Sequence, residues 1–278
     1  MIPELEVDCE RVAILDGGRI VLFQGDSKDI LEQMDILNGL RVDMVLCDPP
    51  YGIKYQGANA FSAIAYDEQP HTEFVLPMAR LMKDNTAMYL CSREDVSHAW
   101  RLKMHEAGLN VKSSILWHKM GGGQGDSQSD LQRPVELILI GHRGRSLLRP
   151  WSWHHLFHWI EKAKATHKGG RRPIDIPDPS KEVRRDTVWW EFPVPQDRVT
   201  RAQHPTPKPP EIMERALISH TDPQGIVLDP FMGSGPVGVA CVRQHRQYIG
   251  IEIESGYFDT AVANIQAAIK ERDDDVSL

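Results

Sequence analysis

The sequence has only four cysteines in 278 residues, and no two of them form a C-x-x-C pair. Cys9, Cys47, Cys91 and Cys241 are scattered, and all but Cys9 lie in or beside apolar runs, so we interpret them as buried, reduced thiols. No apolar run approaches the roughly 18 residues that a membrane-spanning helix needs. The acidic start Met1–Glu6 lacks the pattern of a signal peptide. These absences favour a cytoplasmic protein that does not insert into a membrane.

A G-x-G-x-x-G fingerprint is also missing after the first predicted strand, Arg19–Gln24. That fingerprint binds the pyrophosphate of dinucleotides, so its absence argues against an NAD-dependent oxidoreductase. The hydrophobic share of 41% is sufficient for a substantial core. The length suits one large domain, or one domain that carries an insertion.

Basic and acidic residues are unevenly distributed along the chain. The net charge is −7, but residues 141–208 hold 14 Lys and Arg against 7 Asp and Glu, which makes this stretch +7. Five of the seven tryptophans and six of the twelve histidines lie in the same stretch. A basic, aromatic segment in an otherwise acidic chain attracts polyanions, so we expect this segment to contact nucleic acid.

Apolar strands alternate with helices over most of the chain. Strands are predicted at 19–24, 42–47, 86–90, 111–117, 135–140, 225–228 and 247–253. Helices are predicted at about 31–34, 73–82, 95–107, 210–219 and 257–270, with a further helix ending at 245, and the acidic tail Asp273–Asp275 is expected to fray. The alternation predicts an α/β fold with a doubly wound, mainly parallel, Rossmann-like sheet.

The periodicity is lost between Gly144 and Ala202, a part rich in Arg, Lys, Trp and Pro. We predict an inserted segment at 144–202 between two halves of one domain, 1–143 and 203–278. A glycine-rich stretch, Gly121–Ser127, is predicted to be a loop.

The first chemical signal is Asp48-Pro49-Pro50-Tyr51, which follows a strand predicted to be buried. In open α/β sheets, ligands bind outside the carboxyl ends of the strands. The Asp48 carboxylate and the Pro49 carbonyl can both accept hydrogen bonds from one amino group, and Tyr51 offers a face for stacking. The motif is therefore suited to hold a planar heterocycle by its –NH₂ edge. A proline-stiffened turn without a ligand would show the same four residues.

A second signal is the run Asp229-Pro230-Phe231-Met232-Gly233-Ser234-Gly235, where a strand ends in an acid and a glycine-rich turn opens a helix. Glycines allow a ligand to approach the backbone, and a helix N-terminus favours a carboxylate. Glu252 closes the next strand, where an acid can hold a ribose diol, with Glu254 as the alternative. A tight strand-to-helix turn is the structural alternative for the run.

Two weaker signals complete the set. His204–Pro210 is a proline-rich entry to a helix, and within it Lys208 is the residue with a candidate ligand role. Asp26 follows the strand 19–24 and is therefore predicted on the same rim of the sheet, although a helix cap would explain it equally well.

Taken together, the motifs resemble the amino-methylating DNA methyltransferases of the permuted β type. In that family D-P-P-Y precedes D-P-F-x-G-S-G, a target-recognition segment lies between them, and an H-P-T-x-K-P element comes just before the second motif. All of these features occur here in that order, from about Gly25 to Tyr257. The sequence departs from the usual pattern at Pro207, where the family commonly has glutamine, and the 144–202 insert matches no pattern of target specificity.

The resemblance implies S-adenosylmethionine as the methyl donor, double-stranded DNA as the partner, a bacterial or phage origin and, as for many relatives, a homodimer. It implies that Asp48, Pro49, Pro50 and Tyr51 form the catalytic motif around a flipped base. Cofactor-binding residues implied by it are Asp26 near adenine, Glu252 at the ribose, Asp229, Phe231, Gly233, Ser234 and Gly235 around the methionine moiety, and Thr206 and Lys208 closing that end. Within the insert and beside it, we predict base or phosphate contacts by Arg143, Arg171, Arg172, Arg184 and Arg185.

Adenine N6 is the expected acceptor because aspartate in the first position of D-P-P-Y is commoner in adenine enzymes, whereas cytosine-N4 enzymes more often have serine. Methylation of a ring carbon would instead need a cysteine nucleophile in a P-C motif, which Cys47 does not match. RNA or protein-amide acceptors, and a non-catalytic DNA-binding protein on the same fold, are the remaining alternatives; protein-amide methylases favour N-P-P-Y.

Overall fold

The computed structural model describes residues 2–36, 39–52, 67–120, 134–145, 188–194 and 208–276. In these residues the chain forms a nine-stranded sheet with the order β1-β2-β9-β8-β3-β4-β6-β5-β7. The strands are β1 (Arg11–Leu15), β2 (Ile20–Gln24), β3 (Val42–Cys47), β4 (Met82–Ser92), β5 (Asn110–His118), β6 (Val135–Arg143), β7 (Trp189–Glu191), β8 (Ile226–Asp229) and β9 (Gln247–Glu252). The helices are α1 (Ser27–Ile36), α2 (Val75–Leu81), α3 (Ser97–Glu106), α6 (Pro210–His220), α7 (Pro236–Arg243) and α8 (Ser255–Val276), with short 3-10 turns at Asp16–Gly18 and Thr72–Phe74.

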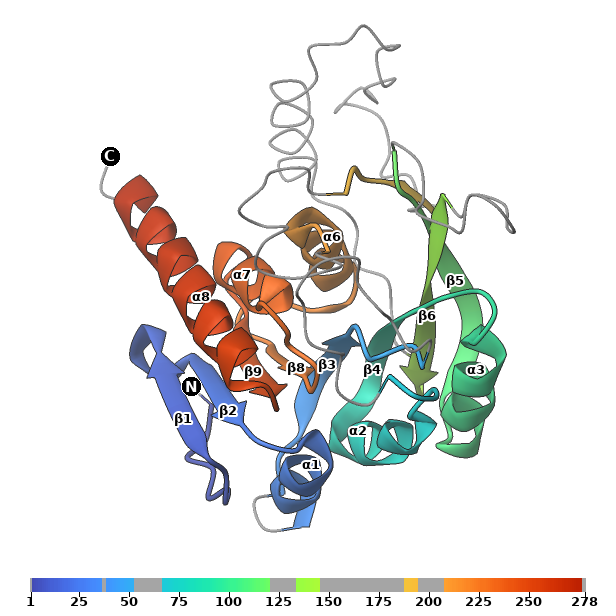
Figure 1. The fold of residues 1–278 in the computed structure, drawn as a ribbon, viewed down its shortest axis with the longest axis horizontal. Helices are drawn as coiled ribbons and strands as arrows, with labels where there is room; N and C mark the ends of the chain where they lie inside the picture. Colours follow the sequence, from blue (N-terminus) through green and yellow to red (C-terminus); the bar gives the residue numbers. More distant parts are fainter. Residues whose placement is uncertain are drawn as a thin grey trace, which may run out of the picture.

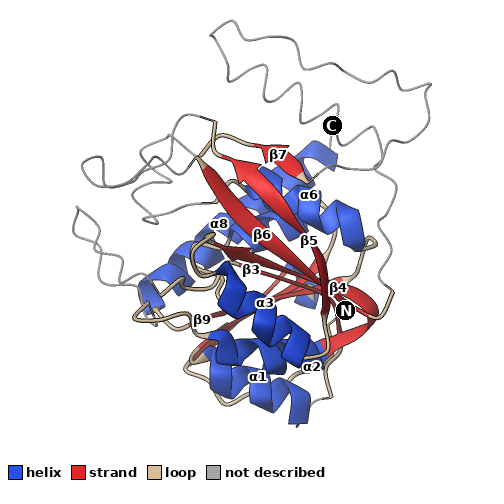
Figure 2. Ribbon diagram, turned by 90° about the vertical axis from the view of Figure 1, so that its right-hand side faces the viewer, coloured by secondary structure: helices blue, strands red, loops and turns tan. Residues whose placement is uncertain are grey.

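Helices cover both faces of the sheet, as the alternation of strands and helices predicts (Figures 1 and 2). One apolar core joins the sheet to α6, α7 and α8 and includes Met213, Val237 and Ile265. A second core on the other face joins the sheet to α1, α2 and α3. Successive side chains of β3 alternate between the two cores, which is why this strand reads as a continuous apolar run.

Five of the eight strand pairings are parallel, and the predicted mainly parallel, doubly wound sheet is therefore confirmed. The antiparallel pairings are β1 with β2, β4 with β6 and β5 with β6. Because β6 runs against β4, the beginning of β6 lies beside the carboxyl end of β4. This reversal determines which residues reach the functional rim of the sheet.

Part of the predicted insert 144–202 belongs to the main sheet. Trp189–Glu191 form β7, which pairs in parallel with β5 at the edge of the sheet. Trp190 and Phe192 are buried in the core under α6. The aromatic content that suggested a separate segment therefore belongs, at these positions, to the main core.

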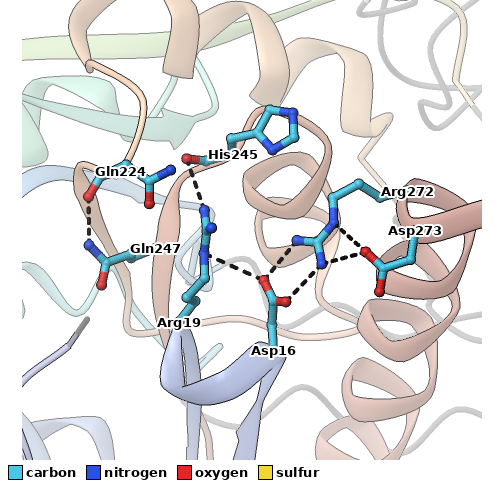
Figure 3. A network of polar contacts seen from close by, with 7 residues as sticks. All are labelled: Asp16, Arg19, Gln224, His245, Gln247, Arg272 and Asp273. Atoms are coloured by element: carbon cyan, nitrogen blue, oxygen red, sulfur yellow. Dashed lines mark hydrogen bonds and ion pairs between the residues drawn. The ribbon is translucent and has the colours of Figure 1, made fainter. Parts of the chain in front are cut away.

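The predicted fraying of the acidic tail Asp273–Asp275 is wrong, because α8 continues to Val276. Arg272 donates two hydrogen bonds to the Asp16 carboxylate, in the turn between β1 and β2, at 2.7 and 2.8 Å (Figure 3). Asp273 accepts a further bond from Arg272. The paired guanidinium lowers the pKa of Asp16, so this bidentate contact anchors the end of α8 to the edge of the sheet.

None of the helices in the described part of the chain is long and apolar enough to cross a membrane.

Candidate active site

The carboxyl ends of four neighbouring strands, β2, β9, β8 and β3, carry the predicted site residues on one rim of the sheet. β3 pairs in parallel with β8, with Val45 opposite Leu228, so Asp48 follows β3 right beside the turn that follows β8. Adjacent strands are about 4.8 Å apart. The two strongest motifs of the sequence, some 180 residues apart in the chain, are therefore neighbours in space.

The Asp48 carboxylate is held by two donors. The Tyr51 hydroxyl donates to Oδ1 at 2.6 Å, and the Lys208 ammonium donates to Oδ2 at 2.7 Å. Lys208 Nζ also lies 3.2 Å from the Tyr51 hydroxyl and 5.3 Å from the centre of its ring. Each carboxylate oxygen has two lone pairs, so Asp48 keeps acceptor capacity for a further amino group.

Gly52 sets the path of the chain just after the catalytic motif. Its φ of +72° lies in the left-handed region that favours glycine. Its backbone N–H donates to Asp67 Oδ1 at 2.7 Å, and a Cβ at this position would lie 2.0 Å from the carbonyl carbon of Gln69. The backbone at 67–70 thus packs directly against the backbone that presents Tyr51.

The environment of Lys208 was not predicted from the sequence. The family resemblance implies that this lysine lies at the methionine end of a cofactor, whereas the structure places its ammonium on the Asp48 carboxylate. Burial alone disfavours the ammonium, but the carboxylates of Asp48 and Glu136 outweigh this effect and raise the pKa of Lys208 above its ordinary value. Glu136 begins β6 and also pairs with Lys119, just beyond β5.

The glycine-rich turn between β8 and α7 is braced from inside. Asp229 is 1% exposed, and its carboxyl accepts hydrogen bonds from the Phe231 N–H and the Tyr248 hydroxyl, both at 3.1 Å. Burial raises its pKa to about 8, despite these bonds. The side chain of Asp229 therefore supports the turn from inside.

Two glycines of the turn, Gly233 and Gly235, have backbone conformations in the left-handed region. Gly233 and Gly235 have φ of +50° and +82°. A Cβ on Gly235 would lie 3.1 Å from the Ala261 Cβ, so this glycine is required by close packing of α8. Asn264 of α8 donates to the Ser234 carbonyl at 2.9 Å. The motif thus also serves packing against α8, in addition to the two roles that the sequence allows, ligand approach and a tight strand-to-helix turn.

Glu252 closes β9 beside this turn. Its carboxylate accepts hydrogen bonds from the backbone N–H groups of Gly233 and Glu254, each at 2.9 Å. Burial raises the pKa of Glu252 to about 6, with the backbone donors acting in the opposite direction. The choice of Glu252 over Glu254 is favoured by this placement, because Glu252 joins the strand end to the glycine-rich turn.

Asp26 caps α1, with Oδ1 accepting from the Lys28 N–H at 2.8 Å. The next residue, Ser27, donates its hydroxyl to the Pro230 carbonyl. Gly25 N–H donates to the Glu252 carbonyl at 3.0 Å. Asp26 is therefore both the helix cap that the sequence allowed and a neighbour of the β8 and β9 strand ends.

These residues fit S-adenosylmethionine by the chemistry of their donors and acceptors. The N-terminus of α7, which directly follows the turn, suits a carboxylate. Glu252 offers carboxylate oxygens for hydroxyl groups. The Phe231 ring, packed edge-on against Phe74 with centroids 5.0 Å apart, adds an apolar wall.

Four of the five arginines predicted to contact DNA lie outside the described residues: Arg171, Arg172, Arg184 and Arg185. Thr206 and the loop Gly121–Ser127 lie outside them as well. Arg143 is described, and it lies at the end of β6 opposite Thr86, remote from the rim that carries Asp48. Its guanidinium donates to Asp84 Oδ1 at 3.2 Å and to the Ala79 carbonyl. The base or phosphate contact of Arg143 stays a prediction.

A doubly wound sheet whose rim joins acceptor oxygens for an amine to a glycine-rich turn and a strand-end glutamate defines a Rossmann-like amino-group methyltransferase. The model of a DNA methylase family, that of the N6 and N4 methyltransferases, matches residues 42–263. The chain belongs to this family of DNA methyltransferases, which use S-adenosylmethionine. The resemblance drawn from the ordered motifs is thereby confirmed.

Among curated proteins, the chain is 23% identical over 265 residues to the type II methyltransferase M2.DpnII of Streptococcus pneumoniae, covering 90% of both chains. It is 25% identical to M2.LlaDCHI of Lactococcus lactis subsp. cremoris over 256 residues, 87% of each. M.Cfr9I of Citrobacter freundii is 27% identical over 190 residues, 68% of this chain and 56% of that protein.

Solved structures share the fold. A complex of M1.HpyAVI with S-adenosylmethionine aligns with a TM-score of 0.63 at 24% identity, over 88% of this chain and 98% of that one. The cytosine-N4-specific PvuII DNA methyltransferase aligns with a TM-score of 0.61 at 12% identity, over 91% and 92%. The similarity in fold to a cytosine-N4 enzyme means that the fold does not decide which base is methylated.

Proposed function

We propose that this protein transfers a methyl group from S-adenosylmethionine to the exocyclic N6 amine of an adenine flipped out of double-stranded DNA. The observation that carries the proposal is the parallel pairing of β3 with β8, which sets Asp48 beside the glycine-rich turn after Asp229. Adenine is favoured over cytosine by aspartate in the first position of D-P-P-Y.

The cofactor, when bound, supplies an activated methyl group on a sulfonium. The protein then has to present the amine in line with it. Asp48 and the Pro49 carbonyl accept hydrogen bonds from the two N–H groups of the amine, which favours a tetrahedral nitrogen and offsets the positive charge that develops there. The Asp48 carboxylate also lies where it can take the one proton that the methylated nitrogen loses. Tyr51 is kept as a neutral phenol, because burial and the neighbouring Asp48 raise its pKa well above the ordinary value.

Direct transfer to nitrogen needs no covalent intermediate with the enzyme. Cys47, which precedes the motif, does not offer one. Burial, together with Asp229, raises the pKa of its thiol well above the ordinary value, and a buried thiol is a poor nucleophile. This supports an amine acceptor over a ring carbon.

Reaching the amine requires the base to leave the duplex, which costs a few kcal/mol that stacking on Tyr51 offsets in part. The basic insert, 144–202, is proposed to contact the DNA backbone and to recognise the target sequence. The proposal also includes action on DNA in the cytoplasm of a bacterium, as suggested by the bacterial relatives, and a homodimer.

The test is the identity of the methylated base. Purified protein and radiolabelled S-adenosylmethionine are incubated with DNA from a host without methylation, and the digested nucleosides are separated by chromatography with mass detection. We expect label in N6-methyldeoxyadenosine. Label in N4-methyldeoxycytidine would replace the adenine proposal with the cytosine one, and absence of label from DNA would contradict both.

Cofactor affinity is expected to fall at acid pH because of Glu252. With its pKa raised to about 6, this carboxyl is ionised above that pH and protonated below it, where it loses acceptor capacity for hydroxyl groups. The fraction of competent protein falls about tenfold from pH 7 to pH 5, and the apparent Kd rises by the same factor. Calorimetric titration of the protein with the cofactor between pH 5 and pH 7 measures the apparent Kd.

The matched variant is Glu252→Gln, in which Kd is expected to be higher at pH 7 and nearly constant down to pH 5. A wild-type Kd that does not change over the range would remove Glu252 from the cofactor site.

A further inference from the structure

The Asp48 carboxylate is one end of a partly buried row of alternating charges. Asp48 contacts Lys208, Lys208 contacts Glu136, and Glu136 contacts Lys119. The four side chains come from the end of β3, the segment before α6, the start of β6 and the residue just beyond β5. Among these, Asp48 and Lys208 belong to the sequence motifs, whereas Glu136 and Lys119 belong to none.

The two contacts of Lys208 with carboxylates are different. Its bond to Asp48 Oδ2 is 2.7 Å long, whereas Glu136 Oε2 lies farther away, in an ion pair of 3.3 Å. Lys208 is only 5% exposed, and a buried ammonium requires compensation by opposite charge. Glu136 therefore supplies a second negative charge that shares the ammonium with Asp48.

The position of Glu136 is itself well fixed. Burial disfavours its carboxylate, but Lys208 and Lys119 outweigh burial and lower its pKa, so it is ionised at neutral pH. The Trp117 ring lies 5.9 Å from the Lys208 ammonium and 5.6 Å from that of Lys119, measured to its centre. The indole N–H of Trp117 donates to the Phe192 carbonyl at 2.9 Å, which locks the ring in place.

We propose that Glu136 is a positioning residue for methyl transfer, which shares the Lys208 ammonium with Asp48 and so leaves the catalytic carboxylate oriented and negatively charged toward the target amine. Without Glu136, the ammonium would be compensated by Asp48 alone. It would then compete more strongly with the amine for the same oxygens and weaken the field that stabilises positive charge on the nitrogen. This inference rests on the proposed function of Asp48 as the acceptor for the amine.

The first test is Glu136→Gln, which keeps the shape of the side chain and removes its charge. We expect kcat for DNA methylation to fall about 10- to 100-fold, as for loss of one electrostatic contribution at a reacting centre, while Kd for the cofactor changes less than twofold. Glu214→Gln is the matched control, because Glu214 is a mostly buried carboxylate paired with Arg243 away from the rim. Its kcat should equal that of the wild type.

A double-mutant cycle with Lys208→Met separates positioning from general structural support. If Glu136 acts through Lys208, then Glu136→Gln added to Lys208→Met should lower kcat no further, since the ammonium that it shares is gone. Full additivity of the two losses, or an unchanged kcat in folded Glu136→Gln, would overturn the proposal. Glu136→Asp, which keeps the charge but shortens the side chain by one methylene, should have a kcat clearly above that of Glu136→Gln; a kcat no higher than that of Glu136→Gln would also contradict the proposal.

A readout that does not need turnover keeps this proposal distinct from the proposed function. Proton–nitrogen NMR of lysine side chains should show the buried Lys208 ammonium in the wild type, assigned by its loss in Lys208→Met. We expect this signal to shift or broaden in Glu136→Gln and to stay unchanged in Glu214→Gln. An unchanged signal in Glu136→Gln would refute the sharing of the ammonium, whereas failure of the wild type to methylate DNA, with the shift present, would contradict only the proposed function.

Discussion

Asp48→Ala is expected to lower kcat for DNA methylation by about 1,000-fold or more while leaving cofactor affinity within about twofold. The variant removes an acceptor for the amine and the negative charge that offsets the charge developing on nitrogen, an effect for which single groups contribute about 100- to 1,000-fold. Loss of the anchor for Tyr51 and Lys208 adds to it. Single-turnover transfer of labelled methyl, with calorimetry for the cofactor, measures both quantities.

Asp48→Asn is the control for this prediction, since it keeps the shape and one acceptor oxygen. We expect it to retain more activity than alanine but far less than the wild type. Methyl transfer at more than about a tenth of the wild-type rate in Asp48→Ala would rule out the catalytic role of Asp48.

Gly52→Ala should severely disrupt the loop that follows Asp48. The new Cβ would lie 2.0 Å from the Gln69 carbonyl carbon and 2.2 Å from the Pro70 nitrogen, both backbone atoms that cannot rotate away. Either the 67–70 backbone or Tyr51 has to move. We expect kcat to drop at least 100-fold, because misplacing a reacting group by about 1 Å has this effect, and thermal unfolding to occur several degrees lower.

Gly108→Ala is the matched control, because Gly108 has a similar φ of +80° but no atom within 4 Å of a new Cβ. It shares the cost of placing alanine in the left-handed region, about 1–2 kcal/mol, without the collision. Equal melting temperatures and equal kcat for the two alanine variants would show that the backbone contact at Gly52 is unimportant.

The strand ends that carry Asp48, Asp229 and Glu252 are predictable because each motif follows a continuous apolar run. In a parallel sheet such ends meet on one rim, so sequence order and chemistry suffice to bring them together. Their side-chain roles were less predictable. The Asp229 carboxyl stabilises the turn that follows it, and Gly235 leaves room for Ala261 of α8. Neither role was predictable, because each depends on a contact with a segment distant in the sequence.

Glu136 could not be found from sequence for a topological reason. A strand in a parallel sheet presents its last residues to the rim, but β6 runs against β4 and presents its first. Val135-Glu136-Leu137 reads as an ordinary strand start with one outward polar residue. Its pairing with Lys208, which lies 72 positions later in the sequence, becomes visible only when the strand order is known.

The short strand β7 changes what can be exchanged between relatives. Trp190 and Phe192 are part of the core under α6. If residues up to 202 were replaced by the recognition segment of a relative, these two core residues would be lost. If the exchanged segment instead ran from Arg145 to Val188, β7 would remain part of the original sheet. Hybrid methyltransferases built on this chain should therefore have their C-terminal junction before Trp189 and Trp190.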